Sequence, residues 1–149
     1  MNANQEYTLP KYFRLHYQKY GDSKVALREK DRGVWKEYTW ADYYSIVKRL
    51  SLALLELGIE KGDKVAVLGE NKPHVYWYEL ATQVNRGSVV GVFSDCTPDE
   101  VKYFIQHSDS TFVVCQDQEQ VDKLLAIKDE IPLVKKVIYW EEKGMWDYD

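Results

Sequence analysis

From residue 62 onward, short apolar runs alternate with longer segments in which apolar side chains recur at helical spacing. The apolar runs lie at residues 64–68, 89–93, 111–115 and 136–140. Each is short and apolar enough to form a strand that is buried on both faces. The segments between them begin with helix-start signals at Asn71, Thr97 and Asp117, and the first is expected to continue to about Arg86 before Gly87. This alternation predicts a Rossmann-like parallel βαβαβαβ unit with right-handed crossovers.

The residues before this unit carry a different pattern. Thr8 and Pro10 indicate a helix start, and Gly21 ends that helix. Two short β-prone runs then flank a polar turn at residues 30–33, which predicts a β-hairpin. The predicted fold class is therefore α/β, with an N-terminal helix and a hairpin ahead of the parallel unit.

The strongest helix signal lies between the hairpin and the first parallel strand. Thr39 and Asp42 have the spacing of a capping box, and Gly58 ends the helix. Its predicted apolar face consists of Tyr43, Val47, Leu50, Leu54 and Leu57.

Length and charge narrow the class of protein further. The chain has 149 residues, a formal net charge of −4 and a pI near 5.4, which fits one domain. This acidic balance argues against a nucleic-acid-binding protein, which needs a basic face. Its apolar runs are far shorter than the roughly 20 residues of a membrane span, and residues 1–13 lack a secretory signal. Two cysteines without a CxxC pair favour the cytoplasm.

Ligands of open α/β sheets bind beyond the carboxyl ends of the strands. Three such ends lie at residues 69–71, 93–96 and 115–117, and none holds a GxGxxG or GxxxxGK[ST] nucleotide loop. The histidines are far apart, without a metal-ligand partner three or four residues on: His16, His74 and His107. The residues by themselves therefore predict no catalytic and no metal-ligating side chain.

Cys96 lies just before a predicted helix, where the helix dipole can favour a thiolate. The cysteine phosphatases carry Arg six residues after their cysteine, whereas this chain has Lys102. A small loop residue is the favoured interpretation of Cys96, and a small cysteine hydrolase stays as an alternative. Cys115 ends a predicted strand and is expected in the core.

Four segments match, in order, motifs of one enzyme family. They are YTWADYY at residues 38–44, GDKVAVL at 62–68 followed by Asn71-Lys72-Pro73, the stretch 91–125, and VIYW at 137–140. Together they resemble the AMP-forming acyl-CoA synthetases of the adenylate-forming superfamily, and the stretch 91–125 is similar to the bacterial long-chain fatty acyl-CoA synthetases. The resemblance covers nearly the whole chain.

The resemblance implies a two-step ligase reaction. A fatty acid attacks the α-phosphate of ATP to give an acyl-adenylate and pyrophosphate, and the thiol of coenzyme A (CoA) then displaces AMP. The full-length enzyme would use ATP, Mg²⁺, CoA and a fatty acid substrate, with Mg²⁺ offsetting phosphate charge. The resemblance also implies that Phe93, Ser94 and Asp95 border the CoA nucleotide, where short-chain relatives carry Gly-Gly in place of Ser94-Asp95.

The family's Ser/Thr/Gly-rich phosphate loop, adenine contacts and C-terminal catalytic Lys have no counterpart in residues 1–149. We therefore expect the chain to be a truncated N-terminal subdomain of a larger ligase, inactive alone. A free-standing α/β binding or interaction module is the alternative. Unpaired sheet edges are expected to favour self-association; no nucleic-acid partner or transmembrane span is expected, and association with a membrane surface stays open.

Overall fold

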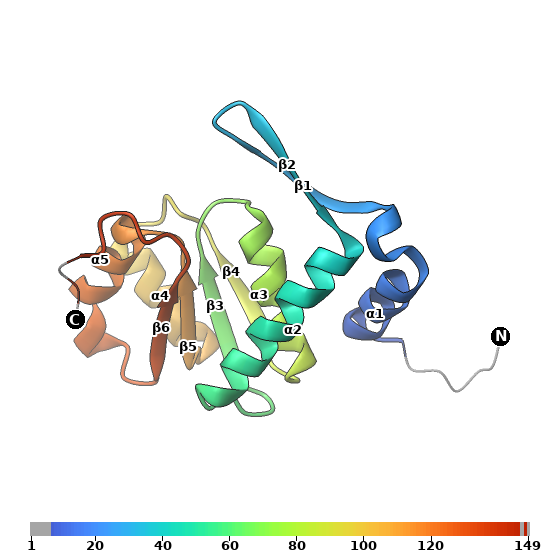
Figure 1. The fold of residues 1–149 in the computed structure, drawn as a ribbon. Helices are drawn as coiled ribbons and strands as arrows, with labels where there is room; N and C mark the ends of the chain where they lie inside the picture. Colours follow the sequence, from blue (N-terminus) through green and yellow to red (C-terminus); the bar gives the residue numbers. More distant parts are fainter. Residues whose placement is uncertain (1–6, 147, 149) are drawn as a thin grey trace.

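The computed structural model describes residues 7–146 and 148, and it begins with helices and a projecting hairpin (Figure 1). The elements of this part are α1 (Leu9–Tyr20), the helical turn η1 (Gly21–Ser23), β1 (Val25–Asp31), β2 (Val34–Thr39) and α2 (Trp40–Glu56). Their order confirms the predicted helix, hairpin and long helix. Within the described residues, we find no helix with the length and hydrophobicity needed to cross a bilayer.

The turn of the hairpin is tighter than the sequence indicates. β1 continues to Asp31, which pairs with Val34, so the turn expected at residues 30–33 consists of Arg32 and Gly33 alone. Both residues have positive φ, 47° and 85°, as a two-residue type I′ turn requires. The difference arises because polar residues in an exposed hairpin strand give the same sequence signal as a turn.

Two helices begin at the reciprocal caps that the sequence predicts. Thr39 Oγ1 accepts the N–H of Asp42 at 3.1 Å, and Asp42 Oδ2 accepts the N–H of Thr39 at 2.9 Å. Thr97 and Glu100 make the same pair of bonds before a later helix. The prediction was wrong for Leu57, which was expected on the apolar face of α2. It lies at the C-cap of the helix and is 40% exposed.

The remaining elements confirm the predicted parallel unit. In chain order they are β3 (Lys64–Leu68), α3 (Pro73–Val84), β4 (Ser88–Val92), α4 (Pro98–Ser108), β5 (Phe112–Cys115), α5 (Gln118–Ala126), the helical turn η2 (Lys128–Glu130) and β6 (Lys136–Tyr139). All neighbouring strands are parallel, and the sheet order is β4-β3-β5-β6. The chain therefore runs from β3 to one edge of the sheet and then crosses back to β5.

Helix α3 ends at Val84, two positions before the predicted end. The Gly87 N–H donates to the Thr82 carbonyl and the Arg86 N–H to the Gln83 carbonyl, each at 3.0 Å, which is the Schellman pattern. Arg86 takes the left-handed position with φ 63°. Glycine is required at the next position, residue 87, because a Cβ atom there would lie 2.8 Å from Thr82 Cγ2.

Helices cover both faces of the sheet, and alternate strand residues belong to two separate hydrophobic cores. Val65 and Phe112 point to the side of α1, α2 and α3 and belong to the cluster that contains Trp77. Ala66 and Cys115 point to the side of α4 and α5 and belong to the second cluster. All four strand residues are 0% exposed, which confirms that Cys115 is a core residue.

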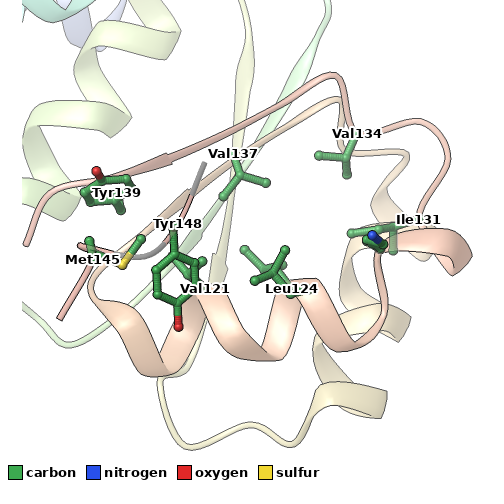
Figure 2. Close-up of a pocket in the computed structure, with 10 residues that line it drawn as sticks. Val121, Leu124, Ile131, Val134, Val137, Tyr139, Met145 and Tyr148 are labelled. Carbon is green, nitrogen blue, oxygen red and sulfur yellow. The ribbon is translucent and has the colours of Figure 1, made fainter. Parts of the chain in front are cut away.

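Strand β6 lies at an edge of the sheet, beside an apolar groove of about 470 Å³ on the α5 side (Figure 2). Val137 and Tyr139 of β6 line the groove and are 43% and 41% exposed, and Leu124 of α5 forms part of its opposite wall. Exposed apolar edges of this kind favour association. Self-association of the isolated chain therefore has a physical basis here and stays a prediction.

Candidate functional site

The topology singles out one crevice at the carboxyl edge of the sheet. β3 leads through α3 to β4, and the chain then returns through α4 to β5 on the other side of β3. Such a reversal is a topological switch point, where open α/β sheets bind their ligands. The crevice lies between β3 and β5, and the segments that follow these two strands are residues 69–71 and 116–117.

Side chains close this crevice. A Cβ atom on Gly69 would lie 2.7 Å from Trp140 Cη2 and 3.0 Å from Gln116 Cβ, which shows how closely the indole covers the turn after β3. Gln116 is 5% exposed, and its Oε1 accepts the N–H of Glu70 at 2.8 Å. In the part of the chain that the structure describes, the switch point is thus packed with protein atoms.

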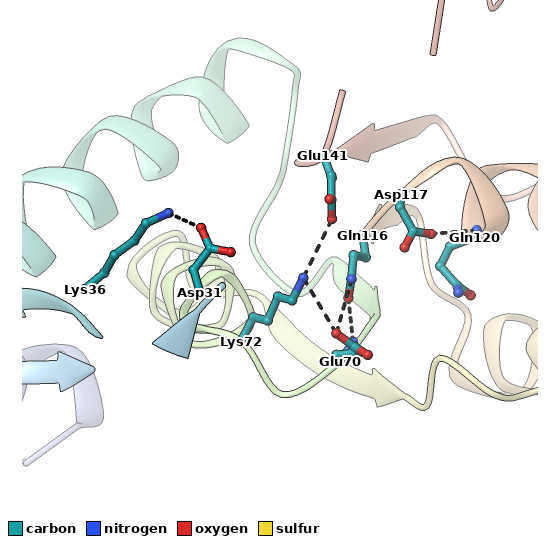
Figure 3. Close-up of polar contacts among 8 residues, drawn as sticks. All are labelled: Asp31, Lys36, Glu70, Lys72, Gln116, Asp117, Gln120 and Glu141. Atoms are coloured by element: carbon teal, nitrogen blue, oxygen red, sulfur yellow. Dashed lines mark hydrogen bonds and ion pairs between the residues drawn. The ribbon is translucent and has the colours of Figure 1, made fainter. Parts of the chain in front are cut away.

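Charged side chains surround the packed crevice (Figure 3). Lys72 Nζ lies 3.6 Å from Glu70 Oε2 and 3.7 Å from Glu141 Oε2, so one cation serves two carboxylates. Asp117 Oδ1 accepts the N–H of Gln120 at 3.2 Å, which confirms the helix cap predicted there. The two ion pairs are partly exposed, so each contributes about 0–1 kcal/mol. With three carboxylates, those of Glu70, Asp117 and Glu141, against the cation of Lys72, this edge of the sheet is negative, which disfavours binding of the phosphates of a nucleotide.

The loop between β4 and α4 is a second carboxyl end, and it contains the three residues to which the family resemblance points. Phe93 is 76% exposed, Ser94 is partly buried and Asp95 is exposed. An exposed aromatic ring offers a flat apolar face with which another ring can stack. The structure therefore places Phe93, Ser94 and Asp95 together at the start of one accessible loop.

Lys123 of α5 holds this loop. Its Nζ donates to the Ser94 carbonyl oxygen at 2.6 Å and to Gln120 Oε1 at 3.2 Å, and it pairs with Glu119 Oε1 at 2.9 Å. The Lys123 side chain is only 15% exposed. The sequence shows Glu119 and Lys123 as a helical i,i+4 pair, but no local signal reveals that Lys123 reaches a loop 29 residues earlier.

The two cysteines have different surroundings. Burial raises the pKa of the Cys115 thiol to about 12, which keeps it protonated. Cys96 is partly buried and donates its backbone N–H to the Phe93 carbonyl at 3.2 Å. Among the described residues, no group of three or more His, Cys, Asp or Glu side chains could hold a metal. A cysteine hydrolase, which needs an activated thiol, therefore gains no support from Cys115 or from a metal among the described residues.

An aromatic cluster packs beside the closed crevice. The rings of His74 and Trp140 are stacked, with centroids 5.4 Å apart and planes within 5°, and the Trp77 centroid lies 4.5 Å from that of His74. Three ring nitrogens are buried without a hydrogen-bond partner among the described residues: His74 Nδ1, Trp77 Nε1 and Trp140 Nε1. Burial lowers the pKa of His74, against a smaller opposing effect of the Glu29 carboxylate. The folded protein therefore favours the neutral imidazole.

The free energy of unfolding is expected to fall between about pH 7.5 and about pH 5.5 because of His74. The unfolded chain takes up a proton near the ordinary histidine pKa of about 6.5, whereas folded His74 resists it, so the unfolded state binds more protons and stability falls as the pH falls. Urea unfolding of the wild type and of His74→Gln at both pH values measures the effect, and His74→Gln should show the smaller decline. His107→Gln, which changes an imidazole stacked on Tyr103, should keep the full decline. An equal pH dependence in wild type and His74→Gln would contradict this role.

Fold and site together define a class: a parallel α/β domain with a packed switch point and one accessible loop at the carboxyl edge. Residues 13–148 match the profile of a family described as AMP-binding enzyme. Because the match extends over most of the chain, the chain belongs to the AMP-binding enzyme family.

Curated relatives are similar to the chain along nearly all of its length. The long-chain-fatty-acid–CoA ligase ACSBG1 of Rattus norvegicus is 28% identical over 137 residues, which are 91% of this chain and 19% of that protein. The long-chain-fatty-acid–CoA ligase heimdall of Drosophila melanogaster is 28% identical over 134 residues, 88% of this chain and 20% of that protein. The chain thus spans about a fifth of the length of these relatives.

Solved structures share the fold. A long-chain-fatty-acid CoA ligase from Rhodopseudomonas palustris superposes with a TM-score of 0.80 at 22% identity, covering 93% of this chain and 34% of that one. The anthranilate CoA ligase AuaEII, solved with anthranoyl-AMP, gives a TM-score of 0.81 at 17% identity, covering 90% and 25%. This likeness confirms the predicted α/β fold, which the chain shares with these two proteins.

Proposed function

We propose that the chain is a segment of a long-chain fatty acid–CoA ligase. Such a ligase joins a fatty acid to CoA through an acyl-adenylate, with release of pyrophosphate and then AMP. The observation that carries the proposal is the family match over residues 13–148, together with relatives of that name that are similar over about nine-tenths of the chain.

The described residues do not fit ATP or Mg²⁺. Trp140 and Gln116 fill the switch point, and no described group of acidic or histidine side chains could hold a metal. We therefore assign the binding of ATP and Mg²⁺ to other parts of the ligase, and this segment provides a packed α/β support.

The loop between β4 and α4 fits an edge of the CoA nucleotide. Phe93 is exposed and can stack on a purine ring. Lys123 fixes the backbone at Ser94, so the loop is held in place before a ligand arrives, which reduces the entropy cost of binding. We assign Phe93, Ser94 and Asp95 to this edge, with Phe93 as the contact that supplies most of the affinity.

No pyrophosphate release is expected from the purified 149-residue chain with ATP, Mg²⁺ and palmitate. The reason is that the groups that bind ATP are assigned to other parts of the ligase. A coupled pyrophosphate assay measures the rate against a sample without protein, and an intact long-chain fatty acid–CoA ligase serves as the positive control. A rate above background that depends on palmitate would overturn the assignment of ATP binding to other segments.

The reading frame beyond Asp149 separates the ligase from a free-standing α/β module. A downstream segment that encodes a Ser/Thr/Gly-rich loop supports the ligase, and its expressed product should release pyrophosphate only when a fatty acid is present. A stop codon directly after Asp149 would instead support the module.

A further inference from the structure

Charge is distributed unevenly between the N-terminal elements and the rest of the protein. Residues 7–39 contain eight basic and four acidic side chains, a net charge of +4, whereas residues 40–149 contain 12 basic and 19 acidic side chains, a net charge of −7. Helix α1 contains Lys11, Arg14 and Lys19 and no Asp or Glu. The basic character of an acidic chain is therefore concentrated at one end of the fold.

A groove of about 300 Å³ between α1 and α2 combines these cations with an apolar floor. Phe13 of α1 and Val47 of α2 contribute to the floor. Lys11, Arg14 and Lys48 also line the groove, and its lining contains no acidic side chain among the residues that the structure describes. Such a lining suits a ligand that has both an apolar part and an anionic part.

The outer side of α1 is apolar as well. Leu9, Tyr12 and Leu15 are 60%, 45% and 48% exposed, and their spacing of three residues places them on one side of the helix. Leu9 also lines a second groove, of about 480 Å³, together with Arg86, and none of the described residues that line it is acidic. A helix with an exposed apolar stripe between cations is typical of a helix that lies on a membrane surface.

Most cations beside α1 are not neutralised within the protein. Among the described residues, Arg14, Lys48 and Arg86 form no ion pair with a carboxylate. By contrast, Lys72 and Lys102 on the acidic remainder each contact two carboxylates. Arg14, Lys48 and Arg86 are therefore available to anions outside the protein.

We propose that α1 and its two flanking grooves form a docking surface for a membrane that carries anionic phospholipids. Leu9, Tyr12 and Leu15 enter the boundary between headgroups and acyl chains, and Arg14 and Lys48 meet the headgroup phosphates. The acidic remainder is repelled by the same surface, so the charge distribution orients the domain with α1 toward the lipid. The inference goes beyond the proposed ligase function and holds whether or not the segment takes part in catalysis.

Co-sedimentation of the 149-residue chain with vesicles tests the proposal. Binding is expected to vesicles of equal parts phosphatidylcholine and phosphatidylglycerol, to weaken with added salt, and to be absent with phosphatidylcholine alone. Arg14→Glu/Lys48→Glu should lower the partition coefficient at least about tenfold, since each cation near an anionic surface contributes to binding. Leu9→Ser/Leu15→Ser should also weaken binding, while circular dichroism shows that both variants keep the wild-type fold.

A matched control reverses two charges away from α1, at Lys61 and Lys143, both of which are exposed. Lys61→Glu/Lys143→Glu should bind almost like the wild type, although its net charge equals that of the α1 variant. An equal loss in both double variants, or no binding of the wild type to phosphatidylglycerol, would overturn the proposal. Release of the bound protein by inorganic phosphate at matched ionic strength would overturn it too, because it would reveal a site for free phosphate in place of a lipid surface.

Discussion

Replacing Phe112 by alanine is expected to lower the free energy of unfolding by about 3–5 kcal/mol. Phe112 is 0% exposed in the middle of the sheet, where β5 pairs with β3 at Val65 and with β6 at Lys136. Its ring belongs to the core beneath α2 and α3. Removing it leaves a cavity that the surrounding strands cannot fill, and the loss is a large fraction of the 5–15 kcal/mol that is typical of a whole domain. Urea unfolding followed by circular dichroism measures the change.

Phe93→Ala is the matched control, because it makes the same chemical change on a ring that is 76% exposed. Its effect on the free energy of unfolding should stay within about 0.5 kcal/mol. Equal losses in Phe93→Ala and Phe112→Ala would show that the ring of Phe112 is not buried in the core beneath α2 and α3.

Gly69→Ala is expected to lower the free energy of unfolding by about 1–3 kcal/mol. The new methyl group would lie 2.7 Å from Trp140 Cη2 and 3.0 Å from Gln116 Cβ, so the indole or the turn after β3 must move. Because Gln116 also accepts the N–H of Glu70, displacement of its side chain costs a buried hydrogen bond as well. The variant should show lower stability in urea together with a changed tryptophan emission spectrum.

Gly91→Ala provides the comparison within the same sheet. A Cβ on Gly91 of β4 would meet no atom of the described residues within 4 Å, and alanine in a strand is favoured over glycine by about 0.5–1 kcal/mol. Gly91→Ala should therefore be as stable as the wild type or slightly more stable. If Gly69→Ala behaves in the same way, the contact between Trp140 and the turn after β3 is not tight.

The elements that the sequence predicts well are those specified by nearby residues. Thr39 with Asp42 and Thr97 with Glu100 are reciprocal caps formed within four residues, and a strand buried on both faces is visible as an apolar run. The errors are local too. Arg86 occupies the left-handed position that glycine usually takes, which displaced the predicted end of α3.

Contacts between distant segments could not be predicted. The sheet order depends on how α3 and α4 pack on opposite faces, and the closure of the switch point depends on Trp140 reaching Gly69. Lys123 reaches Ser94 only after both strands and both helices are in place. For the candidate site, the residues themselves indicated the loop after β4 as one of three strand ends, and only the resemblance to a family singled out Phe93, Ser94 and Asp95 within it.

The sheet order also has a consequence for the kinetics of folding. β3 and β5 form the central pair, with Val65 opposite Phe112, and between them the chain must complete α3, β4 and α4. The pair β3–β4 closes over α3, and the pair β5–β6 over α5 and η2, so each requires a shorter loop. The entropy of loop closure must be lost before non-local contacts form, so we expect the joining of β3 to β5 to be the late and slow event. Until it happens, Val65 and Phe112 are expected to stay open to water and to other unfolded chains.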